Sequence, residues 1–408
     1  MIQGNGLRSA YSATLERIKA QNGSKARLGM EVLMWLSHSE RPLKANELCD
    51  AMGVEIGSAD LNSQNTPAIG TLLGCSLGLV AVEASTDTVR LVHYTLQEYL
   101  SNNANLFPSP HATIAQVCLT YLNFRCVRGL SPIHDLSSQA TPLLRYASCY
   151  WGIHAKRDFT EGMRKPALGL LGGFERHVSS GILLSHNHDN WDGSLGRSNS
   201  TGFTGLHGAA YLGLVEVAAG LLEMKKWDLG TTDATGNTAI LWAVKQGCET
   251  IVEMLLTRED DSPNTADQDG ETPLHRAIIN KHVGIVKMLL ERKYISPNTV
   301  DKDGQTPLHR AVIGNRADIV KMLLEREDVT PGSADKDGQT PLSWAAKSGN
   351  EDIVKMLLEL GGVAPETPHK NGQTPLSWAA ERGHIRVVEM LLERCSVSQD
   401  SLNTDRTD

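Results

Sequence analysis

Hydrophobic residues in the second half of the chain recur with a period of 34 residues. In each period a short apolar stretch at helical spacing is followed by a second one, which ends in two adjacent leucines. These leucine pairs stand at 221–222, 255–256, 289–290, 323–324, 357–358 and 391–392. Two short helices cannot bury their apolar stripes alone, so neighbouring pairs must stack on one another. The pattern predicts an α-helical solenoid of six 34-residue repeats over residues 202–395.

Polar residues mark the start and the middle of each period. A glycine opens every period, and a threonine two residues later is suited to cap the first helix. A second glycine suits a left-handed turn between the helices at positions 213, 247, 349 and 383. Lys281 and Asn315 stand there in the middle repeats; asparagine tolerates this conformation, and we expect strain at Lys281. Aspartates beside the opening glycines are expected in hairpin tips that project into water: Asp267, Asp269, Asp301, Asp303, Asp335 and Asp337.

The segments GETPLHRAI, GQTPLHRAV and GQTPLSWAA closely resemble the ankyrin signature TPLHxAA. The resemblance covers residues 202–395 and implies an interaction module without catalytic activity. Ankyrin repeats bind protein partners through their hairpin tips and through a concave face lined by the first helices. The resemblance also implies that His207, His275 and His309 bond neighbouring backbone groups. We therefore expect a protein ligand, with no cofactor, metal or small-molecule substrate.

One position of each first helix lies near that concave face and forms a ladder of candidate partner-binding residues. Its members are Gly208, Trp242, Arg276, Arg310, Trp344 and Trp378. Tryptophan and arginine are enriched at the energetic centres of protein interfaces. One turn further along the helices lie the other candidates, namely Lys245, Ile279, Ile313, Lys347 and Glu381. The alternative interpretation is that these side chains pack against the next repeat.

The first half of the chain predicts helices followed by a pair of strands. Residues 26–37 place Leu28, Val32, Trp35 and Leu36 on one helical face. A second helix follows Pro42, TPAIGTLLGCS forms a third, and LGLVAVE and TVRLVHY are two strands, which is the order of a winged helix. The expected organisation is mainly α: a winged-helix-like module (1–104), a helical module (105–184), a linker (185–201), the ankyrin solenoid (202–395) and the start of a truncated further repeat (396–408).

The stretches RPLKANELCDAMGVEIGS, GCSLGLVAVE and VRLVHYTLQEYL are similar to the region that follows the nucleotide-binding module in fungal NACHT-type STAND proteins, relatives of NOD-like receptors. The resemblance covers about residues 10–157 and implies that this region couples an NTPase to the repeats. The chain lacks the phosphate-binding motif GxxxxGK[ST]. We therefore expect any NTPase module to be supplied by a missing N-terminus or by a separate chain, and we infer no nucleotide switch for these residues.

Charge and composition narrow the classes of partner. The whole chain has a net charge of −8, and residues 202–408 carry 22 basic and 31 acidic side chains. The acidic repeats should therefore repel phosphate backbones. No apolar run approaches the roughly 20 residues of a membrane span, and the first residues lack the apolar core of a secretory signal. We expect the seven scattered cysteines to be reduced residues of the core. These features favour a cytoplasmic location, with the nucleus as the alternative.

Other motifs offer weaker alternatives. GCSLG matches the GxSxG motif of serine hydrolases, with Ser76 as the nucleophile. A predicted helix precedes this motif and a predicted strand follows it, whereas in a hydrolase a strand precedes the serine and a helix follows it. A winged-helix transcription regulator is the other rival, although the predicted recognition helix has no basic residue and only Arg41 and Lys44 lie nearby. His93 with Glu98 reads as a structural histidine. The linker residues His186, His188 and Asp189 do not complete a metal site.

Overall fold

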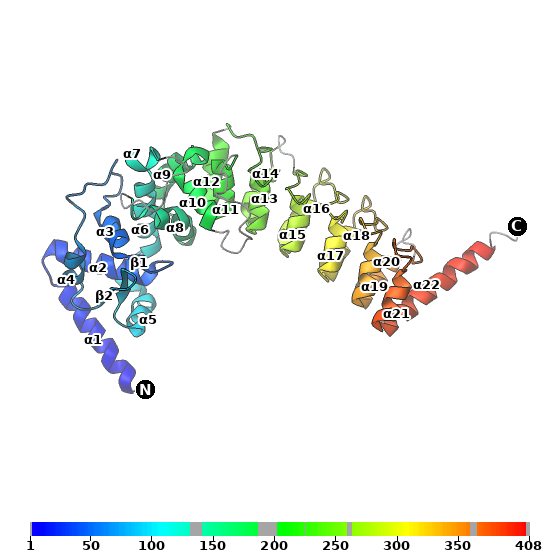
Figure 1. Cartoon of the computed structure of the whole chain (residues 1–408), viewed down its shortest axis with the longest axis horizontal. Helices are drawn as coiled ribbons and strands as arrows, with labels where there is room; N and C mark the ends of the chain where they lie inside the picture. Colours follow the sequence, from blue (N-terminus) through cyan, green and yellow to red (C-terminus); the bar gives the residue numbers. More distant parts are fainter. Residues whose placement is uncertain are drawn as a thin grey trace. The chain divides into compact units, whose positions relative to one another are not determined.

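The computed structural model describes residues 2–130, 141–186, 202–224, 226–258, 263–359 and 365–404. It divides into two compact units, Met1–Trp227 and Asp228–Asp408, which are described separately below (Figure 1). The mainly α fold is confirmed, with a winged-helix-like domain followed by ankyrin repeats. The predicted linker lies almost entirely outside the described residues, as do His188 and Asp189. The first repeat belongs to the first unit. The boundary between the units, after Trp227, therefore lies one helix pair later in the chain than residue 202, where the predicted solenoid begins.

The first unit begins with the predicted winged-helix order. Its elements are α1 (Ile2–Lys19), α2 (Gly23–His38), β1 (Leu43–Lys44), α3 (Ala45–Gly53), α4 (Ile69–Cys75), β2 (Val80–Glu83), β3 (Thr88–Leu91) and α5 (Tyr94–Asn102). The two predicted strands pair antiparallel, and β1, which was not predicted, adds to β3 so that the sheet order is β1-β3-β2. The face predicted for α2 is correct in part, because Val32 and Trp35 are buried. Leu28 and Leu36 are only half-buried, and Leu33 and Met34 are buried in addition.

A helical module completes the first unit and carries the first repeat. Its elements are η1 (Ala104–Leu106), α6 (Pro110–Leu122), α7 (Arg125–Arg128), α8 (Leu144–Arg157), α9 (Glu161–Leu171), η2 (Phe174–Arg176), α10 (Val178–His186), α11 (Gly205–Leu212) and α12 (Val215–Glu223). Helices α11 and α12 pack on α8 and α9. The approach is so close that a Cβ on Gly205 would lie 1.9 Å from the Leu171 carbonyl oxygen. Gly208, the first ladder position, is buried against the Phe174 ring and is therefore not a binding residue.

The second unit consists of stacked helix pairs. They are α13 (Ala239–Lys245) with α14 (Glu249–Leu256), α15 (Pro273–Ile279) with α16 (Val283–Leu290), α17 (Pro307–Ile313) with α18 (Ala317–Leu324), α19 (Pro341–Ser348) with α20 (Glu351–Glu359), and α21 (Pro375–Arg382) with α22 (Ile385–Thr404). First helices stack on first helices and second helices on second helices (Figure 1). Helix α22 continues through Thr404, where the sequence predicted the first hairpin of another repeat.

Local backbone features of the repeats follow the sequence. Threonine side chains cap the first helices; Thr306 Oγ1, for example, accepts the His309 N–H. The opening glycines are left-handed, and at Gly270 (φ +78°) a Cβ would lie 2.9 Å from the Lys302 nitrogen. Lys281 and Asn315 adopt φ values of 63° and 54°, which confirms the prediction for both positions. A lysine at positive φ costs on the order of 1 kcal/mol, so the strain expected at Lys281 is present.

Histidines of the signature hold consecutive repeats together. The Nδ1 atom of His275 accepts the Thr272 N–H (3.3 Å), and its Nε2 atom lies 3.1 Å from the Gln305 carbonyl oxygen of the next repeat. His309 makes the equivalent bonds to Thr306 and Gln339. In the last two repeats serine replaces histidine, and the Ser343 hydroxyl accepts the Thr340 N–H. The structural role predicted for these histidines is confirmed.

None of the described helices is both long enough and apolar enough to cross a membrane.

Candidate protein-binding face

The candidate partner-binding residues lie on the first helices of the second unit. We call this surface the first-helix face; its members are Trp242, Lys245, Arg276, Ile279, Arg310, Ile313, Trp344, Lys347 and Trp378. Seven of the nine side chains are half-buried, whereas Ile279 and Ile313 are exposed. They come from α13, α15, α17, α19 and α21, which follow one another along the solenoid (Figure 1). The face therefore extends over five consecutive repeats.

Buried aspartates nine residues earlier in the chain hold the ladder residues in place. We call Asp233, Asp267, Asp301 and Asp335 the hairpin aspartates. One carboxylate oxygen of each accepts backbone N–H groups of its own hairpin, as Asp267 Oδ1 does from Asp269 (3.0 Å) and Glu271 (3.1 Å). The other oxygen accepts from the ladder residue, at 2.8 Å from Arg276 Nε. A single carboxylate thus joins the hairpin to the first helix.

Tryptophan and arginine use this carboxylate in the same way. The indole Nε1 of Trp242 donates to Asp233 (2.7 Å), and that of Trp344 donates to Asp335 (3.0 Å). Arg310 donates through Nε to Asp301 (2.8 Å). Tryptophan and arginine both carry an N–H group at a similar distance from the backbone, so either can donate to this carboxylate. The rest of each side chain stays partly exposed. Of the six aspartates expected in water, three are therefore buried, while Asp269, Asp303 and Asp337 are exposed.

Charged groups link neighbouring repeats across the middle of the face. The Glu271 carboxylate forms ion pairs with Arg276 Nη1 (2.7 Å) and with Arg310 Nη2 of the next repeat (3.2 Å). Lys245 Nζ lies 3.3 Å from Asp267 Oδ2, and burial is the main cause that lowers the pKa of Lys245. The cations of this region are thus neutralised by acids of the hairpins, which leaves little net attraction for a charged ligand.

A second cluster at the C-terminal part of the face combines two tryptophans and a lysine. The Lys347 ammonium lies 4.8 Å from the ring centroid of Trp344 and 4.5 Å from that of Trp378, within the range of cation–π attraction. The contact joins two repeats. Trp378 differs from the other ladder residues because His369 occupies the place of the hairpin aspartate. Its Nε1 is buried and has no hydrogen-bond partner among the described residues.

This orphaned indole leads to a prediction. Changing His369 to aspartate should give Trp378 Nε1 the acceptor that Trp344 finds in Asp335, while the second carboxylate oxygen takes over the bond that the Asn371 N–H makes to His369. Satisfying a buried donor is worth about 1–3 kcal/mol, so the last repeat should become more stable. Hydrogen–deuterium exchange of peptides from α21 and α22 reports this local stability. His369→Ala is the matched control; equal protection in the two variants would contradict the assignment.

The hairpin aspartates were not predicted as part of the site. The signal was present, because an aspartate recurs 34 residues apart at 233, 267, 301 and 335 and a residue with an N–H donor always follows nine positions later. Turn propensity alone suggested exposure for these residues. The binding role of the nine face residues itself stays a prediction, as does the alternative that they serve packing.

The weaker candidates have structural roles in the first unit. Ser76 is buried, and its hydroxyl donates to the Leu72 carbonyl. His93 caps α5 by accepting the Thr95 N–H. Arg41 pairs through both terminal nitrogens with Glu47, and Lys44 remains exposed. Cys75, Cys118 and Cys149 are buried as expected, but Cys126 is exposed, which corrects the expectation for that residue.

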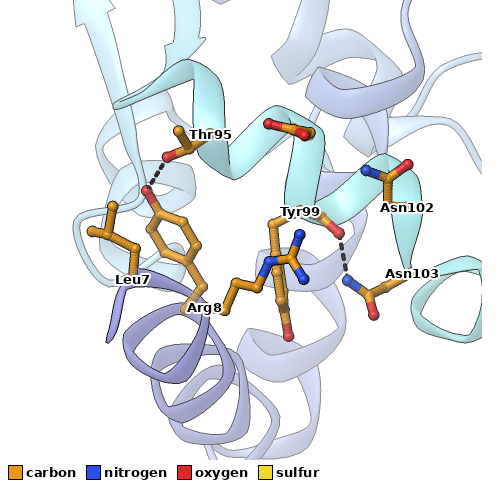
Figure 2. A pocket seen from close by; sticks show the side chains of 8 residues that line it. Leu7, Arg8, Thr95, Tyr99, Asn102 and Asn103 are labelled. Carbon is orange, nitrogen blue, oxygen red and sulfur yellow. Dashed lines mark hydrogen bonds between the residues drawn. The ribbon is translucent and has the colours of Figure 1, made fainter. Parts of the chain in front are cut away.

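A pocket lined by polar and apolar groups lies between α1 and α5 of the first unit (Figure 2). Its volume is about 320 Å³, and Arg8, Glu98, Tyr99 and Asn102 are among its lining residues. Tyr11 and Thr95 also line the pocket, and the Tyr11 hydroxyl lies 2.8 Å from Thr95 Oγ1. Glu98, which was expected beside His93, lines this pocket, whereas His93 bonds to Thr95.

Comparisons with known proteins agree with both parts of the chain. Residues 259–331 and 327–403 match the family described as ankyrin repeats (3 copies), and residues 235–268 match the single ankyrin repeat. Residues 15–116 match the GPI inositol-deacylase winged helix domain. A curated relative, azaphilone pigments biosynthesis cluster protein L of Monascus ruber, is 27% identical over 141 residues, which cover 30% of this chain and 30% of that protein. The chain therefore contains ankyrin repeats, preceded by a domain similar to the winged helix of GPI inositol-deacylases.

Proposed function

We propose that this protein is an adaptor or ligand-sensing protein, without catalytic activity of its own, that binds a protein partner through the first-helix face and the adjoining hairpin tips. Ankyrin repeats are non-catalytic interaction modules, which supports a protein–protein interaction role. The observation that carries the proposal is the pair Ile279 and Ile313. These residues are 37% and 38% exposed and lie beside ladder residues that are held by hydrogen bonds to the hairpin aspartates.

The surroundings of the two isoleucines favour an apolar anchor over a charged one. Arg276 and Arg310 lie one helical turn before them and are already paired with Asp267, Asp301 and Glu271. Fixed side chains lose little conformational entropy when a partner binds. The face thus offers a pre-ordered polar frame around two apolar contacts, which is the composition of a protein interface with an apolar centre. We infer a partner that inserts apolar side chains at adjacent repeats.

Capture by the full chain tests this function. Immobilised parent protein is compared with Ile279→Ser/Ile313→Ser, and bound proteins from a fungal lysate are quantified by mass spectrometry. Burying the remaining surface of both isoleucines is worth about 1–2 kcal/mol, so the variant should capture its partner roughly tenfold less. Circular dichroism of the variant verifies that the two substitutions leave the fold intact.

The control removes exposed apolar surface from elsewhere in the same unit. Ile385 and Leu392 on α22 are 74% and 50% exposed. Ile385→Ser/Leu392→Ser should capture the partner as well as the parent does. Equal capture by all three proteins, or a loss confined to the control, would show that the first-helix face is not the binding surface.

We also propose that the first unit couples partner binding to an NTPase module outside residues 1–408, as in NACHT-type STAND proteins. The match of residues 15–116 to a winged helix domain supports this connection. So does the packing of the first repeat on α8 and α9, because it makes repeat and helical module one compact body. The matched segment spans only 30% of the curated relative, so the activity of that relative is not transferred. A cytoplasmic location is part of the proposal and is supported by the seven cysteines, none of which forms a disulfide with another described residue.

A further inference from the structure

Three potential metal ligands from distant parts of the sequence meet in the first unit. Glu40 follows the C-terminus of α2, His111 lies in the first turn of α6, and His154 lies on α8. One ligand atom from each of the three residues lies within 4.8 Å of the other two. Glu40 and His111 are half-buried and His154 is fully buried. The cluster thus lies at the junction of the winged-helix-like part and the helical module.

The two imidazoles face one another through the same type of nitrogen. The Nδ1 atoms of His111 and His154 are 2.8 Å apart. The other nitrogen of His154, Nε2, lies 2.9 Å from the Tyr146 hydroxyl, which also accepts the Glu40 N–H (3.2 Å). When Nε2–H donates to Tyr146, the lone pair of Nδ1 is directed at His111. Metal-binding histidines are oriented in this way by a partner on their second nitrogen.

The chemistry of the donors matches that of borderline metal ions. Burial lowers the pKa of His154 to about 3, with smaller contributions from the His111 and Arg157 charges, and burial also lowers the pKa of His111. Neutral imidazole is the form that binds metal. A cavity of about 500 Å³ lined by Ser37, Glu40, His111 and Arg157 gives access to two of the three ligands.

We propose that Glu40, His111 and His154 bind a divalent transition-metal ion of the zinc class. Two imidazoles and one carboxylate form a common ligand set for Zn²⁺, and the cavity leaves a fourth position for water. Arg157 now pairs with Glu40 through both terminal nitrogens. The metal takes the place of the guanidinium of Arg157, whose side chain is 46% exposed and therefore has solvent beside it. Bound metal would cross-link α6, α8 and the segment after α2.

The test is zinc binding by the full chain. After chelator treatment and dialysis, the parent protein is titrated with ZnCl₂ at pH 7.5 by calorimetry, and MgCl₂ serves as the hard-ion control. One Zn²⁺ per chain should bind, and His111→Gln and Glu40→Gln should each weaken binding at least about 100-fold, because loss of even an outer partner costs 10–100-fold. Both residues are half-buried, so these variants are better suited than changes at the buried His154.

Two further proteins make the result decisive. Arg157→Gln removes the competing cation and should bind Zn²⁺ several-fold more tightly, a gain that misfolding cannot produce. His93→Gln, which removes an exposed histidine elsewhere in the unit, should bind like the parent. Cobalt substitution separates this site from cysteines, since thiolate ligands give an intense near-ultraviolet charge-transfer band that imidazole and carboxylate do not. The proposal is wrong if the parent binds no zinc, or if His111→Gln and Glu40→Gln both bind zinc as tightly as the parent. His111 and His154 would then be a pair of histidines that share a hydrogen bond.

Discussion

Asp267→Ala is expected to destabilise the middle repeats by about 3 kcal/mol, the lower end of the cost of removing one partner from a buried ion pair, because Arg276 keeps its pairs with Glu271 and Asp269. The Asp267 side chain is only 2% exposed. Its loss leaves Arg276 and Lys245 without their shared carboxylate and frees two hairpin N–H groups. Burial raises the pKa of Asp267, but the hydrogen bond and charge of Arg276 outweigh it and lower that pKa overall. The folded state therefore holds the ionised form.

Hydrogen–deuterium exchange of peptides from α13 to α17 measures this loss locally, which suits a chain with two compact units. Asp269→Ala is the matched control, because Asp269 pairs with the same arginine but is 64% exposed. Exposed ion pairs contribute at most about 1 kcal/mol. Similar losses in both variants would mean that the hairpin aspartates do not fasten the first helices.

Lowering the pH from 6.5 to 4 is expected to cost the repeats about 2–3 kcal/mol through His275 alone. Burial lowers the pKa of His275 to about 4, against an opposing hydrogen bond to the Gln305 carbonyl. Between pH 6.5 and 4 the unfolded chain therefore binds a proton that the folded chain does not. The stabilisation is complete above pH 6.5 and is lost as the pH falls toward 4. Burial lowers the pKa of His309 as well, so it adds to the same trend.

The last two repeats provide the control for this pH dependence. There Ser343 and Ser377 replace the histidines and accept the threonine N–H without titrating. His275→Ser/His309→Ser should be less stable than the parent at pH 7.5 but should lose less stability on acidification. Urea unfolding of both proteins at pH 7.5 and 4.5, followed by circular dichroism, measures the difference. An identical pH dependence would assign the acid sensitivity to other groups.

The repeats were predictable in detail because each requirement is local. A turn with positive φ needs glycine or asparagine, and the spacing of 34 residues carries that requirement from repeat to repeat. Even the exception at Lys281 was visible in the sequence and is strained as expected. Helix pairs of this size also leave few alternative packings. Local pattern thus determined the second unit.

Features that depend on distant residues were not predictable in this way. Glu40, His111 and His154 lie far apart in the sequence and meet only after α2, α6 and α8 have packed. Strand β1 has two residues, too few for a periodic signal, and exists because it pairs with β3. The docking of α11 on α9 depends on Gly205 meeting the end of α9. Tertiary contacts created each of these features.

The carboxylate under each ladder residue has a consequence for how such a surface changes over time. Trp242 and Arg276 satisfy equivalent aspartates with different side chains. The ladder position can therefore hold any long side chain whose N–H reaches the aspartate, while the rest of that side chain is on the surface. Exchanging tryptophan for arginine can change the charge and polarity that one repeat presents to a partner, with little effect on the stability of that repeat. New specificities can accordingly arise one repeat at a time.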